Sequence, residues 1–177
     1  VQPFVLASSI TEHATFPGST TNVAAIGGVL KLVGSGLVDS IPDVSSVADW
    51  DSLGGAVASG TYVFSAAFDW GSVLSKRYTS TIGVSISNVN DLIDSRATNI
   101  DDWTAFDGDV TSACDARVYS SETDDDPAGS PSWAEWQLLE SAELTARAVR
   151  FKAILTTSDP AFNIEVSVLS VAAETAA

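Results

Sequence analysis

The residues of this sequence best suited to chemistry are its tryptophans and two groups of acidic side chains. An indole presents a flat apolar face on which a sugar ring stacks, and a nearby carboxylate accepts hydrogen bonds from sugar hydroxyls. Two of them, Trp50 and Trp103, lie beside acidic residues in segments rich in turn residues. The predicted sugar-binding residues are Trp50, Trp103, Trp133, Asp101 and Asp102. The open alternative is that these tryptophans belong to the core or close one end of the fold.

Spacing separates the remaining tryptophans. Trp70 continues the apolar positions of an alternating strand and is predicted to lie in the core. Trp133 and Trp136 are three residues apart, so a regular strand would place them on opposite faces, one of them more exposed.

Two acidic segments offer oxygen ligands of the kind that Ca²⁺ prefers. The segment around Asp107 and Asp109 is the better candidate, because a long loop can wrap an ion. The other candidates, Asp124 and Asp126, belong to an Asp-Asp-Asp-Pro run that is also typical of an exposed turn. Neither segment has the spacing of an EF-hand, and no other cofactor is predicted.

Catalytic patterns are missing from the sequence. His13 is the only histidine and lies in a Pro-, Ser- and Thr-rich stretch, which disfavours a Ser-His-Asp triad. Cys114 is the only cysteine and has the character of a small buried apolar residue. Pairs of carboxylates, which a glycosidase needs, arise by chance among 23 acids. The sequence predicts a protein that is not an enzyme, with a polysaccharide depolymerase as the remote alternative.

The charge of the chain excludes two classes of partner. Its 8 basic residues against 23 acidic ones give a net charge of −15. Binding of nucleic acid or of an anionic membrane surface requires clustered Lys and Arg, so neither is predicted. No run approaches the roughly 20 apolar residues of a membrane helix, so no membrane insertion is predicted. The chain begins with Val1 rather than methionine, which suggests a fragment or a processed product.

Period-2 alternation of apolar and polar residues predicts an all-β protein. We expect an antiparallel, jelly-roll-like β-sandwich of about seven or eight strands, with one short helix at Asn90–Arg96. Residues 116–120 and 133–139 are predicted to pair as a hairpin, and the other alternating runs are 22–33, 60–70, 78–87, 148–156 and 163–171.

Details of these strands are also predicted. Gly27-Gly28 marks a hairpin turn or a bulge, and Gly71 with Lys76-Arg77 connects two separate strands. Val84 and Val168 are expected to face the core. We divide the chain into an extended N-terminal arm (1–22), the sandwich (23–171) and a C-terminal tail (172–177).

The order of several short segments resembles the distal domains of tailed-phage host-specificity proteins, which form the central tail fibre or tail tip. The resemblance covers about Ser46 to Val171, and the opening arm is similar in style only. The segments are Ser59–Phe64, Asn90–Arg96, Ile100–Trp103, Asp124–Pro127, Pro131–Trp136, Ala146–Phe151 and Asp159–Ile164.

The resemblance implies a location on the virion tail tip and contact with other tail proteins. It also implies assembly as a trimer and a part in host adsorption, with a surface glycan or an outer-membrane receptor as the partner. The alternative is a purely architectural tail component. A weaker likeness to discoidin-like carbohydrate-binding modules concerns the jelly-roll fold.

Overall fold

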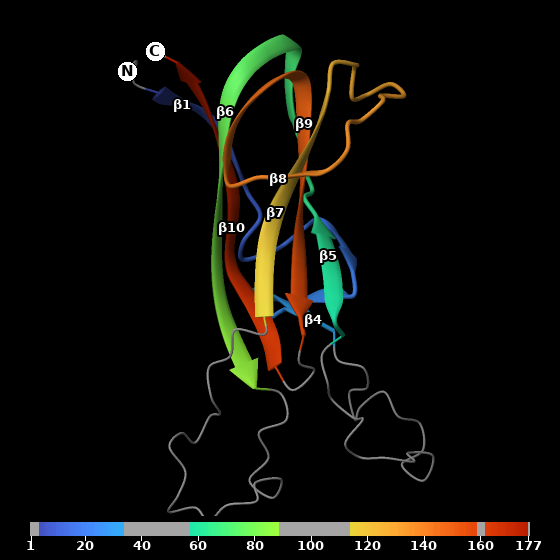
Figure 1. The fold of residues 1–177 in the computed structure, drawn as a ribbon, viewed down its shortest axis with the longest axis vertical. Coiled ribbons are helices and arrows are strands. Elements are labelled where there is room, and N and C mark those ends of the chain that lie inside the picture. The colour runs from blue at the N-terminus through green and yellow to red at the C-terminus, as the bar shows by residue number, and fades with distance from the viewer. Residues whose placement is uncertain (1–3, 34–56, 89–113, 159–161, 177) are drawn as a thin grey trace, which may run out of the picture.

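The part of the chain that the structure describes forms one antiparallel sheet. The computed structural model describes residues 4–33, 57–88, 114–158 and 162–176. Their ten strands belong to one sheet, which curves until it is nearly closed into a barrel-like shape (Figure 1). The all-β, antiparallel prediction is therefore confirmed. The strands are β1 (Phe4–Thr11), β2 (Ser19–Thr21), β3 (Val23–Ile26), β4 (Val29–Leu32), β5 (Ser59–Val63), β6 (Phe68–Asn88), β7 (Cys114–Thr123), β8 (Gln137–Leu138), β9 (Ser141–Thr157) and β10 (Phe162–Ala176).

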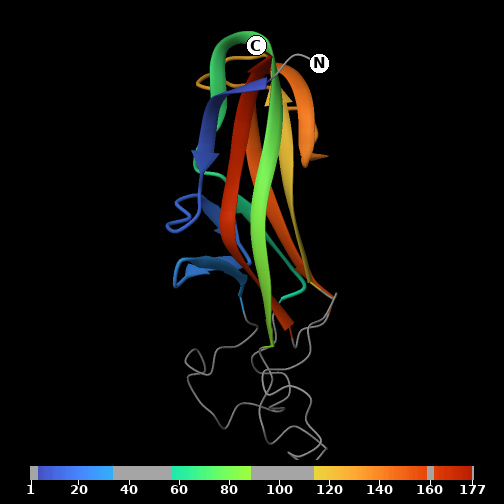
Figure 2. The same ribbon diagram turned by 90° about the vertical axis from the view of Figure 1, so that its left-hand side faces the viewer.

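The three long strands β6, β9 and β10 form the centre of the sheet. β9 pairs with β7 along one edge. Along the other edge, its first part pairs with the first half of β6 and its last part pairs with β5. The second half of β6 leaves β9 and pairs with β10, whose far edge holds β1 and β4. This exchange of partners bends the sheet, so that β6 and β10 run along one side and β7 and β9 along another (Figure 2).

Alternation along β9 sets the inside of the sheet. Val149, Phe151, Ala153 and Leu155 are completely buried, whereas Arg150 and Lys152 between them are partly exposed. This pattern is the one that the sequence predicts. The ring of Phe151 lies at the centre of an aromatic cluster, with centroid distances of 5.7 Å to Phe64, 5.7 Å to Phe68 and 6.1 Å to Tyr78.

One predicted connection is wrong, because β6 is a single strand from Phe68 to Asn88. Gly71, with a φ of 72°, lies inside it, and the pairing with β9 shifts register between Asp69 and Leu74. The glycine therefore accommodates a bulge, which adds residues to one strand without ending it. Lys76 and Arg77 are paired strand residues rather than a turn.

One predicted core position is wrong, and another is more exposed than expected. In β10 a second register shift between Val166 and Val168 exchanges the two faces, so that Leu169 is fully buried and Val168 is only partly so. Val84 lies opposite the fully buried Val166 and so on the core-facing side, as predicted, but it is 51% exposed. It lies beyond Thr79, the last residue of β6 that pairs with β9, so no described strand covers that edge.

Antiparallel hairpins form at both predicted places: the turn rather than the bulge is correct at Gly27-Gly28, and the predicted strand at 133–139 is shortened to β8. Gly27 and Gly28, with φ angles of 62° and 84°, form the turn that joins β3 to β4. β7 pairs with β8, where Tyr119 lies opposite Leu138. The predicted helix at Asn90–Arg96 lies outside the described residues. Within them, no helix is long and apolar enough to cross a membrane.

The ends of the chain take part in the sheet. β1 pairs with the last part of β10, from Phe4 opposite Ala176 to Thr11 opposite Ser170, and the two strands lie side by side in Figure 1. β2 pairs with β5. The described parts of 1–22 and 172–177 thus supply strands rather than a separate arm and tail, because extended backbone pairs with an open sheet edge.

A buried carboxylate fixes the chain just after β1. Glu12 is 1% exposed, and its carboxylate accepts hydrogen bonds from the Tyr62 hydroxyl, from the Ser65 backbone N–H at 3.1 Å and from the Ser65 hydroxyl at 2.8 Å. The Tyr62 oxygen in turn accepts a bond of 2.8 Å from the Gly18 N–H. Burial, and then the hydrogen bond to Glu12, raise the pKa of Tyr62 well above its usual value.

Alkaline solution is expected to weaken the fold. Burial also raises the pKa of Tyr78, whose hydroxyl accepts a bond of 2.8 Å from the Trp70 indole. A phenol with a raised folded-state pKa contributes stability that is complete below its unfolded pKa of about 10 and is lost as the pH rises through the folded pKa. We therefore expect the free energy of unfolding to fall above about pH 10, and less steeply in Tyr78→Phe. Denaturant unfolding at several pH values measures this, and equal slopes in both proteins would contradict it.

Candidate binding surface

Trp133 is the predicted sugar-binding residue that the structure describes. Trp50, Trp103, Asp101 and Asp102 lie outside the described residues, as do the Ca²⁺ candidates Asp107 and Asp109. The candidate site is therefore built outward from Trp133.

The segment that carries Trp133 is fastened to β7. The Ala134 N–H donates to the Glu122 carbonyl at 2.9 Å, and the Ser121 hydroxyl donates to the Ala134 carbonyl at 2.7 Å. Further along, the Leu139 N–H donates to the Val118 carbonyl at 2.8 Å. These bonds hold Trp133 and Trp136 on non-repetitive backbone, just before the two-residue strand β8.

Both tryptophans meet the same arginine. The guanidinium carbon of Arg150 lies 4.3 Å from the Trp133 ring centroid and 4.8 Å from that of Trp136. The prediction that the two indoles point to opposite faces is therefore wrong. It assumed a regular strand, whereas residues 131–136 have no strand geometry, so the period of two does not apply to them.

A lysine extends the same group of rings and cations. The Lys152 Nζ lies 4.6 Å from the Trp136 centroid and 5.8 Å from that of Tyr119, its partner across β7 and β9. We name this group the aromatic–cation row. It consists of Trp133, Arg150, Trp136, Lys152 and Tyr119, all partly exposed. Attraction between a cation and the negative face of an aromatic ring is worth about 0.5–2 kcal/mol per contact and orders the row.

The two cations of the row have no carboxylate partner among the described residues, although the chain is strongly acidic. The Arg150 Nε donates to the Ser121 hydroxyl at 3.3 Å, and burial lowers the pKa of Arg150. Most other basic residues are neutralised: Lys31 pairs with Glu165, Arg77 with Glu174, Arg117 with Asp115, and Arg147 with Asp69 and Asp126. Lys76 instead donates to the Thr175 hydroxyl and lies 4.9 Å from the Trp70 ring.

A pocket of about 210 Å³ adjoins the segment that carries the tryptophans. One oxygen of Glu122, Oε2, is buried without a hydrogen-bond partner, and Glu122 and the exposed Glu135 both line this pocket. In the pairing of β7 with β9, Glu122 lies opposite the fully buried Val149, so its side chain is on the inner face, whereas Arg150 and Lys152 are on the outer face. The other lining residues are Ser120, Ser121, Ala134, Gln137, Leu138, Ala142 and Leu144.

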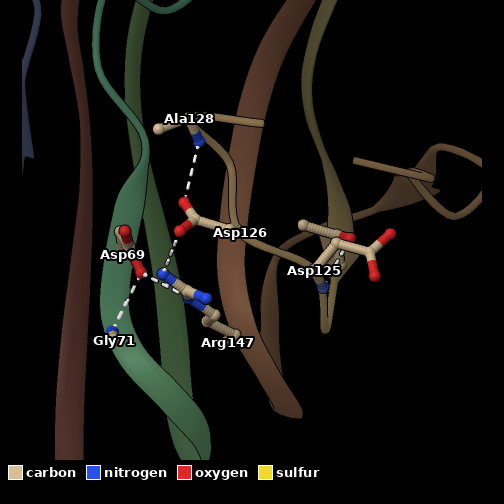
Figure 3. A network of polar contacts seen from close by, with 7 residues as sticks. Asp69, Gly71, Asp125, Asp126, Ala128 and Arg147 are labelled. Carbon is tan, nitrogen blue, oxygen red and sulfur yellow. Dashed lines mark hydrogen bonds and ion pairs between the residues drawn. The ribbon is translucent and has the colours of Figure 1, made fainter. Parts of the chain in front are cut away.

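The Asp124–Pro127 run forms the turn that leads into the row. Asp126 accepts from the Ala128 N–H at 3.0 Å and pairs with Arg147 at 3.0 Å, while Arg147 also contacts Asp69 at 3.4 Å (Figure 3). The bond from Ala128, and then Arg147, lower the pKa of Asp126. Asp125 accepts from the Ser132 N–H at 2.8 Å.

These contacts give Asp125 and Asp126 a structural role, although all three aspartates of the run are exposed. No group of three or more His, Cys, Asp or Glu side chains within the described ranges is placed to hold a metal ion.

The residues set aside as catalytic candidates have structural contacts. The His13 ring nitrogen Nδ1 lies 3.3 Å from the Leu169 carbonyl and 3.4 Å from the Leu169 backbone nitrogen, between β1 and β10. The Cys114 thiol is partly buried and donates to the Thr157 hydroxyl at 3.4 Å.

Sequence reasoning found Trp133 but missed Arg150, Lys152 and Tyr119 as parts of a site. A signal existed for the cations, because their spacing of two on an alternating strand places both on the outer face. No local signal joins them to Trp133, which lies 17 positions before Arg150 in the sequence.

Comparison of the chain with protein-family models, with curated proteins and with solved structures gives no match.

Proposed function

We propose that this chain is a non-catalytic domain of a tailed-phage tail tip or central tail fibre. In this proposal it contributes to host adsorption by binding a surface glycan through the aromatic–cation row. The observation that carries the binding role is the row itself: partly exposed indoles beside two cations that no described carboxylate neutralises. Aromatic faces with a few polar groups are the usual composition of sugar sites.

The virion location rests on the resemblance of the sequence segments. The proposal includes a jelly-roll-like sandwich, association with other tail proteins and assembly as a trimer. The bending of one antiparallel sheet into facing halves supports the sandwich.

An architectural role in the tail is the second candidate. Val5 and Leu6 of β1 are 57% and 62% exposed, close to the end of β10. Apolar side chains exposed on a strand at the side of a sheet favour contact with another protein chain. In this alternative, recognition of the host belongs to another part of the tail.

Loss of the indoles is expected to weaken glycan binding while the fold persists. We expect the double variant Trp133→Ala/Trp136→Ala to bind cells and a panel of bacterial surface polysaccharides at least about tenfold more weakly than the parent protein, because each lost stacking contact is worth about 1 kcal/mol. Trp70→Ala is the matched control, since it removes another partly exposed indole, one that lies against the ammonium group of Lys76. Thermal unfolding verifies that each variant is folded. A parent protein that binds none of the surfaces would favour the architectural role.

A further inference from the structure

We propose that the aromatic–cation row selects acidic saccharides, with the sugar ring against the indoles and its carboxylate held by Arg150 and Lys152. This inference rests on the proposed function and adds the chemical class of the glycan. Two neighbouring cations have no carboxylate partner among the described residues, whereas four of the five other described basic residues form ion pairs.

The distribution of charge is the first argument. The chain has 23 acidic residues against 8 basic ones, and 12 of the acidic residues lie in the described part of the chain. Lys31, a comparable lysine on β4, forms an ion pair with the Glu165 carboxylate at 2.6 Å. Arg150 and Lys152 instead have only aromatic rings and one serine hydroxyl as partners among the described residues. Such a pair attracts an external anion.

The geometry of the donors is the second argument. Arg150 and Lys152 are two residues apart on β9, so their side chains leave the same face of the sheet. The Nε of Arg150 is engaged by Ser121, and its orientation is fixed by two indoles. A guanidinium held in this way presents its remaining N–H groups as a planar fork, which matches the two oxygens of a carboxylate.

The surroundings favour a sugar acid over an extended polyanion. A nucleic acid requires many cations along its backbone, and the net negative charge of the domain would repel it. A saccharide with one carboxylate on a residue needs only a local pair of cations. Its hydroxyls are donors, and the exposed Glu135, on the segment that carries the tryptophans, supplies an acceptor.

Calorimetric titration of the folded domain with matched saccharides tests this inference. The probes are a uronic-acid polysaccharide, the same polymer after chemical reduction of its carboxyl groups to alcohols, a phosphate-bearing polysaccharide and a single-stranded oligonucleotide. We expect the carboxylate polymer to bind, and the reduced polymer to bind at least about tenfold more weakly, since a charge-assisted hydrogen bond contributes about that factor. Added salt should weaken binding of the acidic polymer.

Two substitutions assign the effect to the row. Lys152→Gln is expected to weaken binding of the uronic-acid polymer about tenfold and to leave the reduced polymer unaffected. Lys76→Gln is the matched control, because Lys76 also lies over an indole but belongs to β6, outside the row. Arg150→Lys keeps the charge but removes the fork, so it should weaken binding of the acidic polymer as well.

Each outcome supports or overturns a stated claim. Equal affinity for the native and reduced polymers would overturn the inference and leave the proposed glycan binding intact. Preference for the phosphate polymer or the oligonucleotide would overturn the choice of a carboxylate sugar. If no saccharide in this set or in the wider polysaccharide panel binds the folded domain, both the inference and the proposed function fail.

Discussion

Phe151→Ala is expected to lower the free energy of unfolding by about 3–5 kcal/mol. Phe151 is completely buried on β9 and touches three aromatic rings, those of Phe64, Phe68 and Tyr78. Removing its ring loses the transfer free energy of the side chain and leaves a cavity that rigid strands on both sides cannot fill. Equilibrium unfolding in urea measures the loss as a lower midpoint at unchanged slope.

Phe162→Ala is the matched control for this substitution. Phe162 begins β10 and is only partly buried, so it should cost less than half as much. Losses of similar size in the two variants, or a loss below about 1 kcal/mol for Phe151→Ala, would show that the aromatic cluster is not the centre of the core.

Glu12→Ala is expected to destabilise the protein by about 2–4 kcal/mol. The substitution removes the acceptor of three hydrogen bonds and leaves the buried Tyr62 hydroxyl without one. The cost of an unsatisfied buried donor, about 1–3 kcal/mol, adds to that of the vacated space. Urea unfolding measures the change.

Glu12→Gln separates hydrogen bonding from packing at this position. Its amide retains the volume and one acceptor oxygen, so we expect it to lose less stability than Glu12→Ala. If both variants unfold at the same midpoint as the parent protein, Glu12 does not fix the junction between β1 and the rest of the sheet.

The sequence was most informative where burial alone decides the pattern. β9 alternates from Val149 to Leu155 between apolar and polar residues, and one face of it packs against the core throughout. The period of two therefore predicts both its conformation and its orientation. The Gly27-Gly28 hairpin was predictable for a similar reason, because two successive residues with positive φ favour glycine.

Prediction failed where the backbone leaves the regular period. Beyond the bulge in β10, Leu169 rather than Val168 faces inward. A bulge is set by the fit between neighbouring strands, and this information is not present in either strand alone. The same reason explains Gly71, which looked like the end of a strand and is part of β6.

The candidate site was predictable in part only. Its residue type and its spacing from Trp136 made Trp133 a predicted binding residue, but its partners Arg150 and Lys152 come from a distant strand. Their meeting depends on the path of residues 131–138 over β7 and β9, which is fixed by bonds such as that from Ser121 to Ala134. Such tertiary contacts have no signature in a local pattern.

The most direct test of the aromatic–cation row as the binding surface is an NMR titration of the domain with the polysaccharide that it binds. The indole N–H signals of its tryptophans, assigned by single substitutions, report on each ring separately. We expect the signals of Trp133 and Trp136, and the Arg150 side-chain N–H, to shift with saturation while that of Trp70 stays in place. Saturable shifts confined to Trp50 and Trp103, with Trp133 and Trp136 unmoved, would contradict the account.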